Sequence, residues 1–194
     1  LPVTLISHGS HPVNNDSYAN FELKDNLEGL MVSNFATSTV AQSKIALKSF
    51  KKSKSKCKLI CSQPIMYGTS KNYRKKRNKS KVFTILHAGT PKPLGTRPYI
   101  YETSFEYLNG LFALAKNISE FSDVKLIIRF RPAAEFSSET IHLLLPKYKN
   151  VELVHGGNFY EDLEKSDMLM SFASTTIEES LYQRKPVGLY GANS

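Results

Sequence analysis

The chain has 194 residues, enough to bury a sizeable core as one large or two small α/β units. Its 26 Lys and Arg residues outnumber 17 Asp and Glu residues, and the resulting charge of +9 favours a polyanionic partner such as a nucleotide diphosphate, an anionic lipid or a nucleic acid. Two cysteines exclude a disulfide framework and a four-ligand zinc site, and no apolar run reaches the length of a membrane span, so we expect a cytoplasmic location.

Residues 3–6 are apolar and predict a buried strand, which ends in a turn at His8 and Gly9. A histidine at the carboxyl end of a strand titrates near neutrality. It therefore has the chemistry of a general base, which a hydroxyl acceptor needs in order to attack an activated donor. The plainer alternative is that His8 only caps the turn.

The elements that follow are marked by shorter patterns. Residues 11–28 are polar and predict a loop, and residues 29–35 predict a short strand. A helix is expected to begin at residue 37 or 38 and to end near residue 50, and a strand at residues 58–62 comes next.

Two basic runs follow each other along the chain, with seven lysines in residues 44–58 and seven Lys or Arg residues in 71–81. Dense like charge cannot build a core, so we expect residues 66–81 to link a first domain, 1–65, to a second, 82–194. The plainer role of both runs is a solvated surface. The sharper hypothesis is peripheral contact with anionic lipid at the inner face of the cytoplasmic membrane.

The second domain is predicted to open with a strand that ends at Gly89 and Thr90, where a glycine lets the backbone approach a ligand and a hydroxyl group is added. A helix beginning near residue 103 is expected to bury Phe105, Leu108 and Leu111 on one face.

The second strand of this domain is predicted at residues 124–132, and it carries a pair of arginines near its end. Arg129 and Arg131 alternate along it and point the same way, a geometry suited to clamping a diphosphate. The alternative is that they are surface arginines paired with Glu135 or Glu139. A helix around residues 141–145, a strand at 151–155, a turn at Gly156 and Gly157 and a helix at 160–165 come next.

The last unit is an apolar strand at residues 168–172, a polar cluster, a helix and a strand at 187–190, so we predict an α/β fold with a parallel sheet. The cluster, Ser174, Thr175 and Thr176, begins the helix, whose unpaired N–H groups attract phosphate. A carboxylate one turn later has the acceptor sites to bind two ribose hydroxyls. A well-capped helix without a ligand is the plainer alternative.

The segment Asp-x-x-x-Ser-x-x-Ser-Thr-Thr-x-x-Glu-(x6)-Pro-Val resembles the donor-nucleotide signature of GT-B glycosyltransferases and CDP-glycerol glycerophosphotransferases. The resemblance implies a truncated pair of Rossmann-like domains, with residues 1–65 ending the acceptor-side domain and 82–194 beginning the donor-binding one. It places the ribose on Glu179, seven residues before Pro186, with Glu178 as the second choice, and the diphosphate on the hydroxyl cluster.

The same resemblance extends to other strand ends. It implies that His8 and Gly9 line the cleft, that Gly89 and Thr90 lie near the donor phosphates or the domain interface, and that the Gly156–Gly157 turn reads the base with Phe159 stacking on it. The chain departs from the family's Lys-x-His-Pro at Arg131, which replaces the histidine.

We therefore expect a glycosyl or glycerophosphoryl transferase of bacterial surface-polysaccharide synthesis, with a nucleotide-diphosphate donor, a saccharide or lipid-linked acceptor and no nucleic-acid partner. No Asp-x-Asp motif is present, so neither a metal nor another cofactor is expected. A nonhydrolysing UDP-N-acetylglucosamine 2-epimerase is the enzyme alternative, although Ser-Thr-Thr stands where that family has glycines. A nucleotide-binding module without transfer activity is the third.

Overall fold

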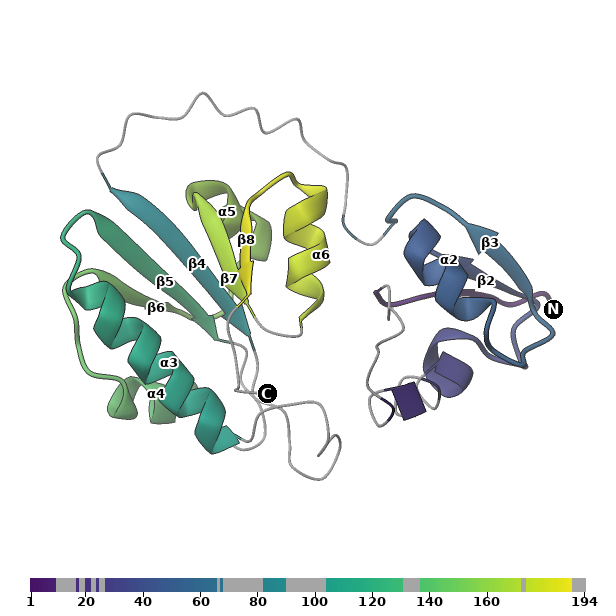
Figure 1. Cartoon of the computed structure of the whole chain (residues 1–194), viewed down its shortest axis with the longest axis horizontal. Coiled ribbons are helices and arrows are strands. Elements are labelled where there is room, and N and C mark those ends of the chain that lie inside the picture. Colours follow the sequence, from purple (N-terminus) through teal and green to yellow (C-terminus); the bar gives the residue numbers. More distant parts are fainter. Residues whose placement is uncertain are drawn as a thin grey trace. The chain divides into compact units, whose positions relative to one another are not determined.

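The computed structural model describes residues 1–9, 17, 20, 21, 24, 27–65, 67, 82–89, 104–130, 137–171 and 174–189. The chain divides into two compact units, Leu1–Thr69 and Ser70–Ser194, each built on a parallel sheet (Figure 1). The expected linker at residues 66–81 falls almost wholly outside the described residues. The roles expected of the two domains stay predictions.

Unit 1 contains a parallel sheet in the order β1-β2-β3. Its strands are β1 (Thr4–Ile6), β2 (Ser38–Ala41) and β3 (Lys58–Cys61), and its helices include the π-helix η1 (Leu27–Met31) and α2 (Lys44–Phe50). The core of this unit includes Leu27, Met31 and Phe50, which are buried.

Three expectations for unit 1 were wrong. The strand expected at residues 29–35 is replaced by η1 and a turn, and the expected helix start at 37 or 38 is the fully buried strand β2. The helix begins at Lys44 instead, because the Ser43 hydroxyl accepts a hydrogen bond from the Ala46 N–H at 3.0 Å and caps it. Strand β1 is only half-buried, with Ile6 42% exposed, since in the described chain it pairs with β2 alone.

Unit 2 is a five-stranded parallel sheet in the order β6-β5-β4-β7-β8. Its strands are β4 (Phe83–Gly89), β5 (Val124–Phe130), β6 (Val151–Val154), β7 (Met168–Ser171) and β8 (Val187–Leu189). Its helices are α3 (Ser104–Ser119), α4 (Ser138–Leu144), α5 (Phe159–Lys165) and α6 (Thr175–Tyr182). The alternation of strands and helices predicted from the sequence is confirmed here.

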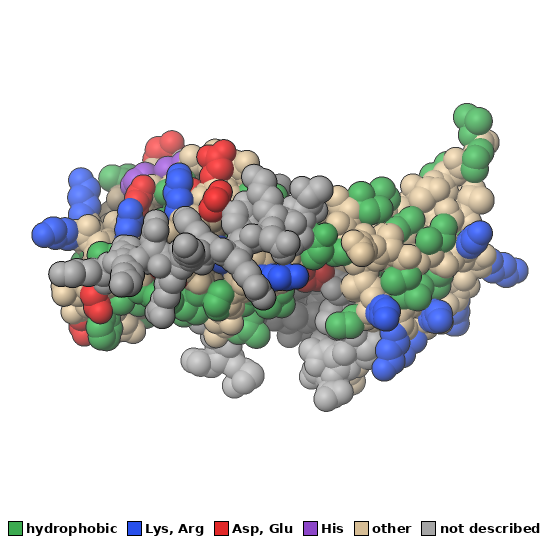
Figure 2. Space-filling model, turned by 90° about the horizontal axis from the view of Figure 1, so that it is seen from above, with side chains coloured by type: hydrophobic (Ala, Val, Ile, Leu, Met, Phe, Trp, Pro, Cys, Tyr) green, Lys and Arg blue, Asp and Glu red, His purple; other side chains and the backbone are tan. Residues whose placement is uncertain are grey.

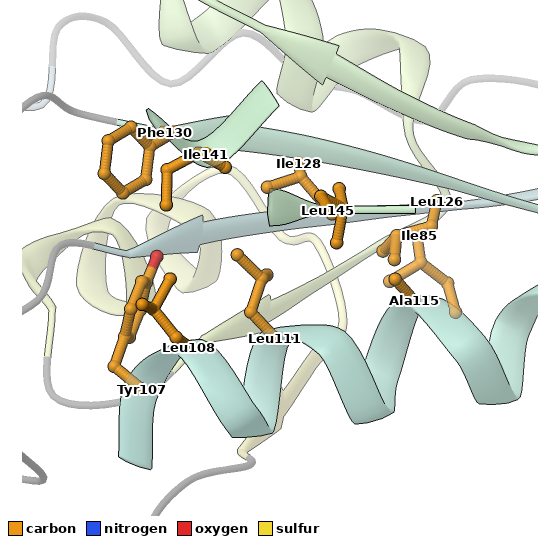
Figure 3. Packing of buried hydrophobic residues seen from close by; sticks show 10 residues of the cluster. All are labelled: Ile85, Tyr107, Leu108, Leu111, Ala115, Leu126, Ile128, Phe130, Ile141 and Leu145. Carbon is orange, nitrogen blue, oxygen red and sulfur yellow. The ribbon is translucent and has the colours of Figure 1, made fainter. Parts of the chain in front are cut away.

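Both faces of this sheet are covered, because successive strand residues point to opposite faces and each face has its own helices. Ile85 packs under α3 and α4 with the cluster shown in Figure 3. Leu86 packs on the other face, where Leu163 of α5 and Ile177 of α6 lie. Phe105 of α3 is 72% exposed, against expectation, and Tyr107 is buried in its place.

The strand order of unit 2 defines where a ligand is expected. The chain runs outward from β4 to β5 and β6, then returns to β7 and β8 on the other side of β4. Connections leave the carboxyl ends of β4 and β7 in opposite directions, and open α/β sheets bind ligands at such a switch point. No helix in the described part of the chain has the length and apolarity that a membrane span requires.

Candidate functional site

Helix α6 begins at the switch point with a network of hydroxyl groups. Ser174 is its N-cap, with Oγ accepting from the Thr176 N–H at 3.3 Å and from Thr176 Oγ1 at 3.0 Å. Thr176 Oγ1 also lies 3.4 Å from Ser171 Oγ, which donates to the Ala88 carbonyl at 2.6 Å. These bonds fix the positive end of α6 beside the last residues of β4 and β7. The helix start predicted at the hydroxyl cluster is therefore found.

His87 joins the same two strands from inside the core. Its Nδ1 lies 3.1 Å from the Met170 carbonyl, and since a carbonyl only accepts, Nδ1 carries the proton. Its Nε2 is then the acceptor for Tyr107 Oη at 3.5 Å. Burial lowers the pKa of His87 to about 4, against the opposing bond to Met170, so the ring is neutral. The sequence showed this residue only as one polar side chain in an apolar strand.

Gly89 lies two residues after this histidine, at the end of β4. A Cβ atom at Gly89 would lie 3.3 Å from Cε1 and 3.4 Å from Nε2 of His87, closer than side chains normally pack. The glycine therefore keeps the end of β4 close to the imidazole. Thr90, predicted beside it, lies outside the described residues.

Glu179, predicted to hold the ribose, is half-buried in α6 and is hydrogen-bonded to the side chain of Tyr160 in α5. Burial, then the Glu179 charge and this hydrogen bond, raise the pKa of Tyr160 to about 12, so the phenol is the donor and the carboxylate accepts. Tyr160 follows Asn158, whose Oδ1 accepts from the Tyr160 N–H at 3.0 Å and caps α5. Glu179 is thus tied to the beginning of α5.

The Gly156–Gly157 turn precedes that helix. Both glycines have left-handed backbone conformations, with φ of 66° and 68°, which explains why glycine occupies both positions. No atom lies within 4 Å of a Cβ atom built at either glycine, so the constraint comes from the backbone conformation and not from space. Phe159, the predicted stacking residue, is half-buried against the core of the α5 face.

Arg129 connects the end of β5 to this turn. Its Nη1 lies 2.5 Å from Asp162 Oδ2, and its Nη2 donates to the Gly157 carbonyl at 2.6 Å. The two charged side chains are only 17% and 13% exposed. Arg129 is therefore paired with Asp162 of α5. The alternative considered from the sequence, a pair with Glu139, is not formed by Arg129. Arg131 and Glu135 lie outside the described residues, and the diphosphate role of both arginines stays a prediction.

His8, the predicted base, lies in unit 1 at the carboxyl end of β1 and is exposed. The expected turn is present, with Gly9 at φ 87°. The preceding residue is held by two bonds, from the Ser7 N–H to the Val40 carbonyl at 3.1 Å and from Gln42 Nε2 to the Ser7 carbonyl at 2.5 Å. The backbone before His8 is therefore fixed, while its ring reaches solvent.

A groove of about 340 Å³ lies beside α5 over strands β4, β5 and β6 of unit 2. Thr84, Lys125 and Glu152 contribute to its lining, together with Asp162 and Lys165. Thr84 and Lys125 belong to the first residues of their strands, the opposite end from the switch point. None of the predicted donor-binding residues lines this groove, so we do not place the donor in it.

No family model matches the sequence, and no curated protein matches it. Solved structures match in fold. The S. aureus MnaA–UDP co-structure has a TM-score of 0.59 at 16% identity, over 96% of this chain and 51% of that chain. UDP-N-acetylglucosamine 2-epimerase from Rickettsia bellii has a TM-score of 0.50 at 13% identity, over 96% of this chain and 49% of that chain. The GtfA/B complex has a TM-score of 0.50 at 9% identity, over 100% of this chain and 38% of that chain.

Identities this low show the fold alone. The matches confirm the predicted α/β, Rossmann-like architecture with parallel sheets, which these GT-B-type neighbours share over most of this chain. The chain spans about half the length of the first of these structures.

Proposed function

We propose that this chain carries the donor-nucleotide site of a GT-B-type enzyme that acts on a nucleotide-activated sugar or on CDP-glycerol. The observation that carries the proposal is the hydrogen bond between Glu179 and Tyr160. It brings the carboxylate expected to bind a ribose to the helix that begins at the Gly156–Gly157 turn, where the base is expected. The beginning of α6, where we expect the phosphates to bind, precedes the same carboxylate by one turn.

In this proposal the three parts of a nucleoside diphosphate meet three parts of unit 2, the diphosphate at the beginning of α6, the ribose at Glu179 and the base at the Gly156–Gly157 turn. The N–H group and the hydroxyl group of Thr175, at the beginning of α6, are proposed to donate to the diphosphate, and the helix dipole favours its charge. Glu179 accepts from the ribose hydroxyls. A carboxylate offers about four acceptor sites, so the bond from Tyr160 leaves room for both hydroxyls.

The remaining predicted residues complete the reaction. His8 is proposed to remove the proton of an acceptor hydroxyl, which then attacks the activated carbon or phosphorus atom of the donor, and the nucleotide departs with its charge stabilised by the beginning of α6. Arg129 is given a second role, since its contact with the Gly157 carbonyl holds the turn that would read the base.

The comparisons support a nucleotide ligand. The S. aureus MnaA structure was solved with UDP, and the Rickettsia bellii protein is a UDP-N-acetylglucosamine 2-epimerase. Sugar transfer to a surface polysaccharide, with a saccharide or lipid-linked acceptor, is the form of the activity that we propose.

An epimerase-like activity is the second candidate, favoured by the name of the Rickettsia bellii neighbour. Both enzymes bind the same kind of nucleotide, so binding alone does not separate them. Transfer releases one nucleotide for each new bond that forms to the acceptor, whereas epimerisation produces an isomer of the sugar nucleotide. A module without activity binds the nucleotide and produces neither.

A thermal-shift screen with UDP, CDP, CMP and GDP tests the proposal on the chain as it stands. A ligand that binds only the folded state stabilises it by about 2.7 kcal/mol at a hundredfold excess over Kd. We expect one nucleotide to raise the Tm clearly more than the others. A Tm unchanged by all four would contradict the proposal. Product analysis with the matching activated donor then separates transferase, epimerase and inactive module.

A further inference from the structure

The strands of unit 1 begin along one edge that is both basic and apolar. The Lys58 N–H donates to the Thr37 carbonyl at 3.1 Å, and the Thr37 N–H donates to the Val3 carbonyl at 2.8 Å. These bonds place the starts of all three strands side by side. The basic edge is defined here as Val3, Phe35, Lys51, Lys52, Lys54, Lys56 and Lys58, all of them exposed.

The charge of this edge is strongly one-sided. Residues 27–65 contain seven lysines and one acidic residue, Glu28. Five of the seven lysines belong to the basic edge, where they follow α2 or lead into β3. Figure 2 shows several blue side chains, with green apolar atoms beside them, on the surface that unit 1 forms. Such a concentration of like charge favours association with a polyanionic partner.

The apolar side chains narrow the choice of partner. Phe35 is 96% exposed and Val3 is 53% exposed, at the starts of adjacent strands. An exposed aromatic ring on the same edge as several ammonium groups is a composition that binds the interface of a bilayer, with the ring among the headgroups and the charges on lipid phosphates. Single-stranded nucleic acid is bound instead by several aromatic rings on which successive bases stack, and Phe35 is the one aromatic residue of this edge.

We propose that the basic edge docks this protein on a bilayer that contains anionic phospholipid, with Phe35 inserted among the headgroups. The edge lies at the amino ends of the strands, whereas His8 lies past the carboxyl end of β1. Docking therefore leaves His8 exposed. The inference does not depend on the nucleotide site, and nucleotide should not alter membrane binding.

Cosedimentation of the full chain with vesicles tests the inference. Vesicles of phosphatidylcholine alone are compared with vesicles that also contain phosphatidylglycerol, at low and at physiological salt. Binding is expected only with phosphatidylglycerol and should weaken as salt rises. Each lysine near an anionic surface contributes about a fivefold factor in the partition coefficient, so K52Q/K54Q/K56Q should lower it about 100-fold.

Two further variants make the test specific. K116Q/K147Q/K149Q removes the same charge from exposed lysines of unit 2 and is expected to retain most of the binding. F35A, at a fully solvated position, should lower the partition coefficient about tenfold without affecting the Tm. Equal binding to both kinds of vesicle, or equal losses in the two triple variants, would overturn the inference. The inference would also be overturned if the native chain bound neither kind of vesicle but bound an RNA oligonucleotide, and K52Q/K54Q/K56Q lost that binding.

Discussion

The hydroxyl group of Tyr160 donates a hydrogen bond to the carboxylate of Glu179, which joins α5 to α6 across the carboxyl end of the unit 2 sheet. Replacing Tyr160 by Phe removes this donor and keeps the ring. Glu179 then loses a charge-assisted bond worth about 1.5–3 kcal/mol before reorganisation, so nucleotide affinity should fall about fivefold through freer motion of the carboxylate.

The same bond has a spectroscopic signature. Burial, then the Glu179 charge and this bond, raise the pKa of Tyr160 to about 12 from an ordinary value of 10.0, so the phenol stays protonated at a pH at which an ordinary phenol ionises. The stability that this contributes is present below pH 10 and is lost as the pH rises through 12. The difference between the ultraviolet titrations of the native chain and Y160F should have its midpoint near pH 12. A midpoint near the ordinary value would mean that the Tyr160 hydroxyl is open to water in solution and is not in contact with Glu179.

The Arg129–Asp162 pair should be important for stability. Its side chains are largely buried, so R129A is expected to lower the free energy of unfolding by about 2–3 kcal/mol, since it leaves the Asp162 charge and the Gly157 carbonyl without their partner. Urea denaturation measures this. The Lys125–Glu152 pair is a matched control, because its side chains are 41% and 52% exposed, and K125A should cost less than about 1 kcal/mol. Equal losses in R129A and K125A would contradict this account.

The left-handed turn predicts a contrast between two substitutions at one position. G157A should lower the free energy of unfolding by about 1 kcal/mol, because alanine is strained at φ 68° although nothing obstructs its side chain. G157N should cost less, since asparagine tolerates this conformation. If both variants denatured at the same urea concentration, backbone strain would not be the reason for the glycine.

His87 predicts a loss of stability in mild acid. Burial lowers its pKa to about 4 in the folded chain, against an ordinary value of 6.5. Between these two pH values the unfolded chain binds a proton at this histidine and the folded chain does not. The contribution of the neutral His87 to the free energy of unfolding is complete above pH 6.5 and declines as the pH falls toward 4. Between pH 7 and pH 5 it amounts to about 2 kcal/mol.

Denaturation at the two pH values isolates this effect. An H87L variant should lose less stability than the native chain between about pH 7 and pH 5, although its Tm is expected to be lower at both. An unchanged pH dependence in H87L would show that His87 is already protonated or open to water in the folded chain.

The sequence predicted unit 2 well because its strands are covered on both faces. Residues 126–128 and 168–170 are apolar runs that are followed by a polar residue, and this pattern identifies a buried parallel strand without help from the rest of the fold. Ser38–Ala41 was misread since a strand of four residues is too short to show a period. Val40 also fits the apolar spacing of the helix that follows. The pairing of Ser38–Ala41 with β1 and β3 is what makes this segment a strand.

The candidate site, too, has one part that the sequence predicted and one part that it did not. The beginning of α6 was predictable because Ser174 caps it locally. The contacts of Arg129 with Asp162, 33 residues away, and of Tyr160 with Glu179 were not, since they depend on how α5 packs against the sheet and against α6. No local pattern contains that information.

Calorimetric titration of the full chain with the nucleotide that raises the Tm most is the most direct test of the central claim. Glu179 is expected to bind the ribose through charge-assisted hydrogen bonds, so E179A should weaken nucleotide binding by about 10- to 100-fold. E178A is the matched control, one residue away in the same helix, and should stay within about threefold of the native affinity. If E178A abolished binding while E179A kept it, or if both bound as the native chain does, the proposed ribose contact would be wrong.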